Sequence, residues 1–198
     1  MKFSRSILAS ILAVVMFATA CSTSWVTEAI AITNAILPVA VNVIQLVTAL
    51  QGTATSSSDM ALAQKWANLV TADLSTLKML LDQYNAAAAS AKPGILGQIE
   101  AALAVTQSDL GTLLPALHIS NAQTVAKITA IVGLVSAEIQ SIAALVQAAR
   151  NSKTTGWHEL KVAKPMTAKE FKVAYKTLVK SRSGYSPLDA ATRTLVLP

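Results

Sequence analysis

Residues 128–146 read ITAIVGLVSAEIQSIAALV, and their spacing is the clearest indication of the fold. Its large apolar residues recur every three or four positions, at Ile128, Val132, Val135, Ile139, Ile142 and Val146. A repeat averaging about 3.5 residues places one apolar row along a helix, which is typical of helices that pack side by side in left-handed bundles. Residues 128–146 therefore predict one helix of a bundle.

Three earlier segments carry a row of the same kind. The first is Ala29, Ile32, Ile36, Val39, Val43, Leu46 and Leu50. The second is Met60, Ala63, Ala67, Val70, Leu74, Leu77, Leu81, Tyr84 and Ala88. The third is Leu96, Ile99, Leu103, Thr106, Leu110, Leu113 and Leu117. Because 198 residues with seven Gly and six Pro hold too few turn residues for a sandwich or barrel, we expect an all-α, antiparallel up-down-up-down four-helix bundle.

Polar and turn residues separate the four rows. Residues 52–58 (GTATSSS) form a small polar loop, in which Ser58 can cap the second helix. Residues 92–94 (KPG) are expected to stop the second helix. Ser120 with Gln123 three positions later has the pattern of a capping box that opens the fourth helix.

The first twenty residues have the three parts of a secretory signal peptide. Lys2 and Arg5 form a basic start, and residues 7–17 (ILASILAVVMF) form an apolar run that is too short to span a bilayer. Small residues follow at positions 18–20, and Cys21, the only cysteine in the chain, comes next. A single cysteine excludes an internal disulfide and any metal site built from several cysteines.

Residues 18–21 (ATAC) resemble the lipobox of bacterial lipoproteins, although position 18 holds Ala where that family usually has Leu. Ser22 is similar to the family's sorting signal for the outer membrane. The resemblance implies that Cys21 becomes an acylated N-terminus, with palmitate-type chains that bind membrane lipid on the periplasmic face of the outer membrane. The alternative is ordinary cleavage after Ala20, which leaves a free or intermolecularly paired thiol.

Charge divides the rest of the chain into a bundle, residues 21–152, and a tail, residues 153–198. The bundle holds five basic and seven acidic residues, whereas the tail holds nine basic and three acidic residues. The formal net charge of +6 therefore originates in the tail and the signal peptide. A basic segment attached to a nearly neutral body predicts an interaction arm.

Within the tail, residues 166–180 (MTAKEFKVAYKTLVK) predict a short amphipathic helix near residues 167–181, opened by a capping box of Thr167 and Glu170. One side of this helix carries the apolar residues Phe171, Tyr175 and Leu178. The other side and the end carry the cations Lys169, Lys172, Lys176, Lys180 and Arg182. Four antiparallel helices return the chain to its starting end, so we expect this helix near the anchoring membrane.

These eight residues are the candidate contacts to an anionic surface or partner. Two interpretations stay open: the apolar side packs on the bundle while the lysines are solvated, or the helix binds an external partner. That partner would be anionic lipid, a cell-wall polymer or an acidic protein. We expect no nucleic acid outside the cytoplasm.

The first helix also raises the question of membrane insertion, because residues 29–58 carry no charge. Asn34, Asn42 and Gln45 lie with Pro38 on one side of it, and a lipid-exposed span would leave their amides unsatisfied. A bundle that faces water is therefore the better interpretation, with a single spanning first helix as the alternative.

No catalytic or metal-binding pattern occurs in the sequence. Asp73 and Asp82 are too widely spaced on one helix to pair, and we expect both to face water. Glu100, Asp109 and Glu138 would resemble a di-iron site if they converged, but the Glu-x-x-His motif is missing. We therefore expect no enzyme, cofactor or metal.

The resulting hypothesis is a lipid-anchored envelope protein that acts as a scaffold or partner-binding module. One alternative is a membrane-active bundle that inserts its uncharged first helix. The other is a small-ligand carrier with a cavity inside the bundle, because many core positions hold Ala.

Overall fold

The computed structural model describes residues 5–151 and 165–198, with side chains from residue 24 onward. The helices are α1 (Arg5–Ala49), α2 (Ser57–Ala86), α3 (Lys92–Ala116), α4 (Ala122–Asn151), α5 (Ala168–Lys180) and α6 (Ser186–Thr192). Within these ranges there is no β-strand, and the expected all-α class is confirmed. The side chain of Cys21 and the segment 152–164 lie outside the described residues.

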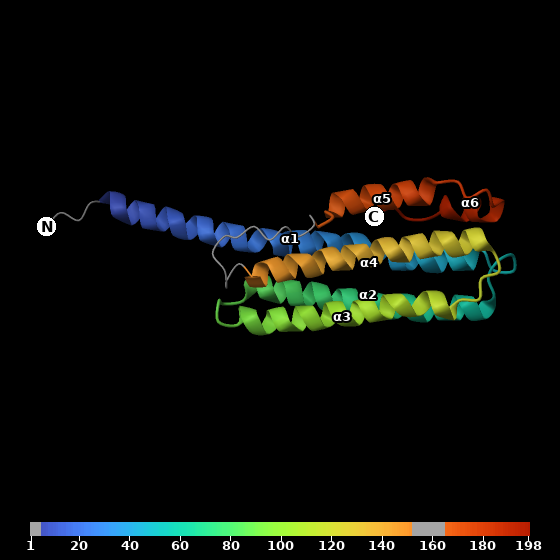
Figure 1. Cartoon of the computed structure of the whole chain (residues 1–198), viewed down its shortest axis with the longest axis horizontal. Coiled ribbons are helices and arrows are strands. Elements are labelled where there is room, and N and C mark those ends of the chain that lie inside the picture. Colours follow the sequence, from blue (N-terminus) through green and yellow to red (C-terminus); the bar gives the residue numbers. More distant parts are fainter. Residues whose placement is uncertain (1–4, 152–164) are drawn as a thin grey trace.

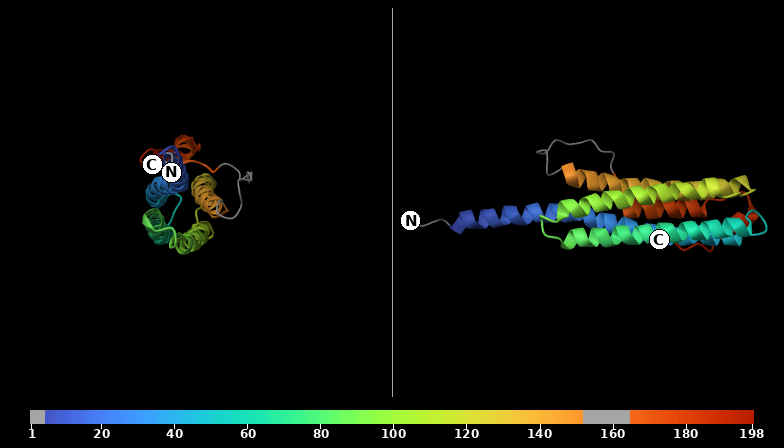
Figure 2. Two further views of the ribbon diagram at one scale, coloured as in Figure 1. Left: turned by 90° about the vertical axis from the view of Figure 1, so that its left-hand side faces the viewer. Right: turned by 90° about the horizontal axis from the view of Figure 1, so that it is seen from below.

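Four long helices lie side by side (Figure 1). α1 contacts α2 and α4, and α3 contacts α2 and α4 in turn. The end-on view shows the same four helices around a common centre (Figure 2). We call the part of α1 from Ser24 onward, together with α2, α3 and α4, the helical body. The first half of α1 extends beyond this body at one end (Figure 1).

The predicted apolar rows form the centre of the helical body. Every member of the first and fourth rows is buried, from Ala29 to Leu50 and from Ile128 to Val146. In the second and third rows only the end positions differ: Met60 and Leu117 are half-buried, and Ala88 lies exposed beyond the end of α2. Burial of a Leu, Ile or Val side chain stabilises the fold by about 1.5–3 kcal/mol, so these rows hold the helices together.

Two of the predicted helix caps are wrong by one or two residues. Ser56, not Ser58, caps α2: its Oγ accepts a hydrogen bond from the Asp59 amide at 3.1 Å, and Asp59 Oδ2 accepts from the Ser56 amide at 2.8 Å. Asn121, not Ser120, caps α4, because its Oδ1 accepts from the amide three positions later at 2.9 Å. Ser120 instead donates its amide hydrogen to the loop before α2 at 3.2 Å.

The expected stop at residues 92–94 is also wrong. α2 ends earlier, at Ala86, and Lys92 is the first residue of α3. Pro93 lies in the first turn of α3, where a helix needs no backbone donor and the fixed φ of proline suits the helix. The proline therefore begins a helix here.

The tail packs along the helical body. α5 contacts α1 and α4, and α6 contacts α1. The predicted capping box is confirmed, with Thr167 Oγ1 accepting from the Glu170 amide at 3.2 Å and Glu170 Oε2 accepting from the Thr167 amide at 2.8 Å. α6 was not predicted, because the short segment Ser186–Thr192 shows little periodicity.

Only the start of α5 lies near the end of the body from which α1 extends. The last turn of α4 is at that end, where Arg150 pairs with Glu100 of α3 at 2.9 Å. α5 extends along the helical body in the direction away from this end, and α6 lies at the opposite end (Figure 1). α5 therefore extends along the side of the helical body, where it packs against α1 and α4, and its position near a membrane stays a prediction.

Candidate functional site: the docked tail and its cationic face

The apolar side of α5 is buried against the helical body. Phe171 and Tyr175 are fully buried, and their rings stack with centroids 6.2 Å apart. Val179 is buried and Leu178 is half-buried. Three of the candidate contact residues, Phe171, Tyr175 and Leu178, therefore face the body, and the cations of α5 remain on its outer side.

Asn42 of α1 is the central polar contact between body and tail. Its Nδ2 donates to Tyr175 Oη and to the Val196 carbonyl, both at 2.6 Å. Its Oδ1 accepts from the Val196 amide at 3.0 Å. Burial raises the pKa of Tyr175 to about 12, so the hydroxyl stays protonated at neutral pH. Asn42 is one of the amides that a lipid-exposed α1 would leave unsatisfied, and its hydrogen-bond partners lie in the tail. No local sequence signal reveals this pairing.

Lys127 of α4 binds the C-terminal end of α5. Its Nζ donates to the carbonyls of Leu178 and Ser181 and to Ser181 Oγ, each at 2.8 Å. These carbonyls belong to the last turn of α5, where a cation also suits the helix dipole. Burial lowers the pKa of Lys127, while the charge of Asp189 acts in the opposite direction. In sequence the only signal was a lone cation within the otherwise uncharged first half of α4.

The N-terminal end of α5 lies close to two acidic residues of the body, Glu28 and Glu138. Glu28 Oε1 accepts a hydrogen bond from the Ala168 amide at 2.8 Å. Glu138 of α4 is fully buried, and neither carboxyl oxygen has a hydrogen-bond partner among the described residues. Burial, and then the charges of Glu28 and Glu170, raise the pKa of Glu138 to about 8. The Glu138 carboxyl is therefore mostly protonated at neutral pH.

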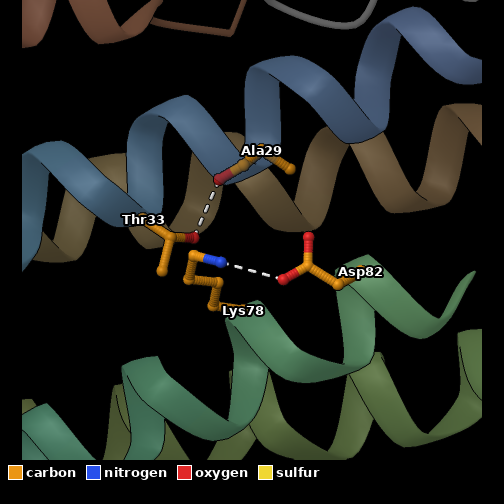
Figure 3. Close-up of polar contacts among 4 residues, drawn as sticks. All are labelled: Ala29, Thr33, Lys78 and Asp82. Carbon is orange, nitrogen blue, oxygen red and sulfur yellow. Dashed lines mark hydrogen bonds and ion pairs between the residues drawn. The ribbon is translucent and has the colours of Figure 1, made fainter. Parts of the chain in front are cut away.

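The polar contacts on the neighbouring helices α1 and α2 are of a different kind. Figure 3 shows Thr33 Oγ1 donating to the Ala29 carbonyl at 2.8 Å, and Lys78 Nζ contacting Asp82 Oδ2 at 2.8 Å. Each bond drawn there stays within its own helix. An exposed pair four residues apart contributes only a few tenths of a kcal/mol. The tail, by contrast, is joined to the body by hydrogen bonds between residues far apart in sequence.

The outer side of the tail carries the predicted cations. We call the exposed residues Lys169, Lys172, Lys176, Lys180 and Arg182 the cationic face. In the part of the chain that the structure describes, none of them forms an ion pair. α5 is capped, and its apolar side is buried against the body. A row of unpaired cations on the outer side of such a helix is a fixed positive surface, which attracts anions at long range.

The acidic residues of the body do not converge. Glu100 pairs with Arg150, and Glu138 lies under the tail. Asp73 of α2 was expected to face water but is half-buried, and its Oδ2 is buried without a hydrogen-bond partner among the described residues. Burial and then the charge of Asp109 raise the pKa of Asp73 to about 6. Among the described residues no group of three or more His, Cys, Asp or Glu side chains is placed to hold a metal ion.

Among the residues whose side chains the structure describes, two helical segments are long and apolar enough to cross a membrane by length and composition, Ser24–Ala49 and Ala122–Asn151. About half of the apolar window of each, 56% and 44%, is buried inside the protein. Core helices of a bundle share this property, so it does not by itself separate a spanning helix from a core helix.

Comparison of the chain with models of known protein families, with curated proteins and with solved structures found no match. The functional conclusion therefore depends on the chemistry of the chain's own residues.

Proposed function

We propose that this chain is a non-enzymatic, lipid-anchored protein of the bacterial cell envelope, whose helical body presents the cationic face to an anionic partner. In this proposal residues 1–20 are removed as a signal peptide, and acyl chains on Cys21 hold the protein on the periplasmic face of the outer membrane. The observation that carries the partner-binding role is the docked α5, with Phe171 and Tyr175 buried and its lysines exposed.

We also propose that the helical body is an antiparallel up-down-up-down four-helix bundle. The contacts of α1 with α2 and α4, and of α3 with the same two helices, support this topology. The connections between successive helices are short, which favours antiparallel neighbours.

The position of the cationic face favours a partner beside the body. At 1.5 Å per residue along α1, Glu28 lies about 10 Å from Cys21 and Asn42 about 30 Å. The hydrogen bonds of these two residues to Ala168 and Tyr175 place α5 over the same range. In an upright body most of these cations lie farther from the anchoring leaflet than the screening length of about 10 Å. A cell-wall polymer or an acidic protein fits this arrangement better than the leaflet's own headgroups.

The two alternative functions have less support. Insertion of α1 into a membrane would separate the buried amide of Asn42 from Tyr175 and Val196, which costs the desolvation of several polar groups. Leakage of liposomes caused by the chain without residues 1–20 would favour that alternative. A carrier with an internal cavity has less support, because large side chains of the predicted rows, such as Ile36, Leu74 and Ile139, are buried in the helical body.

The anchor is tested by metabolic labelling with a palmitate analogue. We expect label on the wild-type protein and none on Cys21→Ser, because the acylated sulfur is removed. Ser24→Ala, a change three residues away, is the control and should retain the label. An unlabelled wild-type protein would contradict the lipid anchor. The proposal for the cationic face does not depend on this result and has its own test.

The cationic face is tested by retention of the protein on immobilised polyglutamate. The double variant Lys172→Gln/Lys176→Gln should elute at clearly lower salt than the wild type, because each neutralised contact reduces the salt-dependent attraction. The matched control Lys65→Gln/Lys92→Gln removes two charges from the body and should elute close to the wild type.

Equal loss of retention in both double variants would show a response to net charge alone and would reject a specific face. Retention on vesicles that contain anionic lipid, with none on polyglutamate, would assign the partner to a bilayer instead.

A further inference from the structure

A hollow of about 420 Å³ lies where the end of α5, α6 and the last residues of the chain meet. Its cationic lining is Lys180, Arg182 and Arg193, all exposed. Its apolar lining is Val179, Leu195 and Leu197. The hollow thus combines three positive charges with hydrocarbon. Of the elements that line it, α6 lies at the end of the body opposite the N-terminus (Figure 1).

One acidic residue, Asp189, also lines the hollow, and its carboxylate is already engaged. Asp189 Oδ1 accepts from the Ser183 amide at 2.7 Å and from Ser183 Oγ at 2.8 Å. These hydrogen bonds hold the pKa of Asp189 below its ordinary value. The lining therefore keeps a positive balance, and no ion pair neutralises its cations within the described ranges.

Both walls of the hollow are held by hydrogen bonds to two buried side chains of the body, Lys127 and Asn42. Lys127 fixes Ser181 through its carbonyl and its hydroxyl, each at 2.8 Å. Asn42 fixes the backbone of Val196, between the two leucines of the lining, through one donated and one accepted hydrogen bond. Leu197 is nevertheless 44% exposed, so apolar surface stays uncovered beside the cations. A site held in place before binding loses less entropy when a ligand arrives.

We propose that this hollow binds a single small amphiphilic anion, with a phosphate or carboxylate head on Arg182, Arg193 and Lys180 and a short hydrocarbon part over Leu195 and Leu197. Arginine suits such a head because its planar guanidinium donates two parallel hydrogen bonds to an oxyanion. The site lies on the tail and uses neither Cys21 nor the middle of the cationic face, so it is independent of the lipid anchor.

The test uses residues 21–198 with Cys21→Ser, which retains every side chain of the described core. Titration calorimetry with octyl phosphate below its aggregation concentration should show binding. Inorganic phosphate lacks the hydrocarbon, and octyl glucoside lacks the charge. The affinity for each should therefore be lower than the affinity for octyl phosphate by about tenfold or more. Anionic vesicles form a second arm and should not compete with octyl phosphate, since the site takes one molecule and not a bilayer surface.

Variants locate the site within the tail. Arg182→Gln/Arg193→Gln should weaken octyl phosphate binding by about tenfold or more, the scale of one lost charge-assisted hydrogen bond. The matched control Lys169→Gln/Lys172→Gln removes two charges elsewhere on the tail and should leave the affinity within about twofold. Leu197→Ser should weaken octyl phosphate and leave inorganic phosphate unchanged, and its exposure predicts an unaltered fold.

Three outcomes would overturn the proposal. Equal weakening by the two double variants would show attraction by net charge only. Equal affinity for octyl phosphate and inorganic phosphate would remove the apolar part of the site. If the folded protein without further substitutions did not bind octyl phosphate, the proposed site would be rejected.

Discussion

Glu138 is the residue whose ionisation depends most clearly on folding. Its ordinary pKa of 4.5 rises to about 8 because burial and the charges of Glu28 and Glu170 disfavour the carboxylate. Above about pH 4.5 the unfolded chain releases this proton while the folded protein retains it. The free energy of unfolding therefore falls as pH rises from about 4.5 to about 8, by up to about 1.4 kcal/mol per pH unit.

Glu138→Gln should remove most of this pH dependence, because the amide does not ionise. We expect the urea midpoint of the wild type to fall between about pH 6 and pH 8, and that of the variant to stay nearly level. Asp73 acts with the same sign, but its pKa of about 6 places its effect mostly below that range. Glu100→Gln, at a surface ion pair, is the control and should keep the slope. An unchanged slope in Glu138→Gln would show that other groups cause it.

At the scale of elements, α5 and the C-terminal segment are fixed on the body by a few polar contacts within an apolar interface. Asn42 bonds both Tyr175 of α5 and the backbone of Val196, so one side chain joins two parts of the tail. Lys127 and Glu28 bond the two ends of α5. The position of the cationic face therefore depends on contacts that lie beneath it.

Asn42→Ala should loosen the tail, because it leaves the Tyr175 hydroxyl and both Val196 backbone groups without their partner. Each lost buried hydrogen bond costs about 1–3 kcal/mol. We expect faster amide hydrogen exchange in residues 168–198 and little change in α2 and α3. Asn34→Ala changes an exposed amide of the same helix and should leave exchange in the tail unaltered. Uniform acceleration through the whole chain by Asn42→Ala would contradict a separate docking role.

At the scale of the whole molecule, the tail has two roles that the variants can separate. It buries Phe171, Tyr175, Val179, Leu188 and Leu195 together with the body. It also carries the cations on the outer side. The first role concerns stability and the second concerns binding, since exposed charges contribute little to folding.

Truncation after residue 164 should lower the free energy of unfolding by roughly a few kcal/mol, because the gain from burial exceeds the entropy of ordering the tail. The same truncation should increase binding of a hydrophobic dye, which reports the newly exposed side of α1 and α4. The variant with all four lysines of α5 changed to Gln retains the burial and should unfold close to the wild type. Equal stability of the truncated and full-length chains would show that the tail does not stabilise the body.

The apolar spacing of the sequence predicts the four long helices, their buried rows and the amphipathic tail helix, but it does not predict α6. The predicted helices and rows depend on a spacing of three to four residues, which local geometry converts directly into a helix face. Even the errors at Ser58, Ser120 and residues 92–94 were small, because several neighbouring residues are able to cap or begin a helix there.

The position of the tail and the identity of its polar partners follow from tertiary packing and not from local sequence. Asn42 with Val196, Lys127 with Ser181 and the unpartnered Glu138 depend on residues from separate helices meeting in space. No periodicity encodes such meetings, because burial and hydrogen bonding between distant segments arise only once the helices have packed. The same is true of the hollow between α5, α6 and the C-terminus, whose lining comes from separate segments of the tail that meet only after packing.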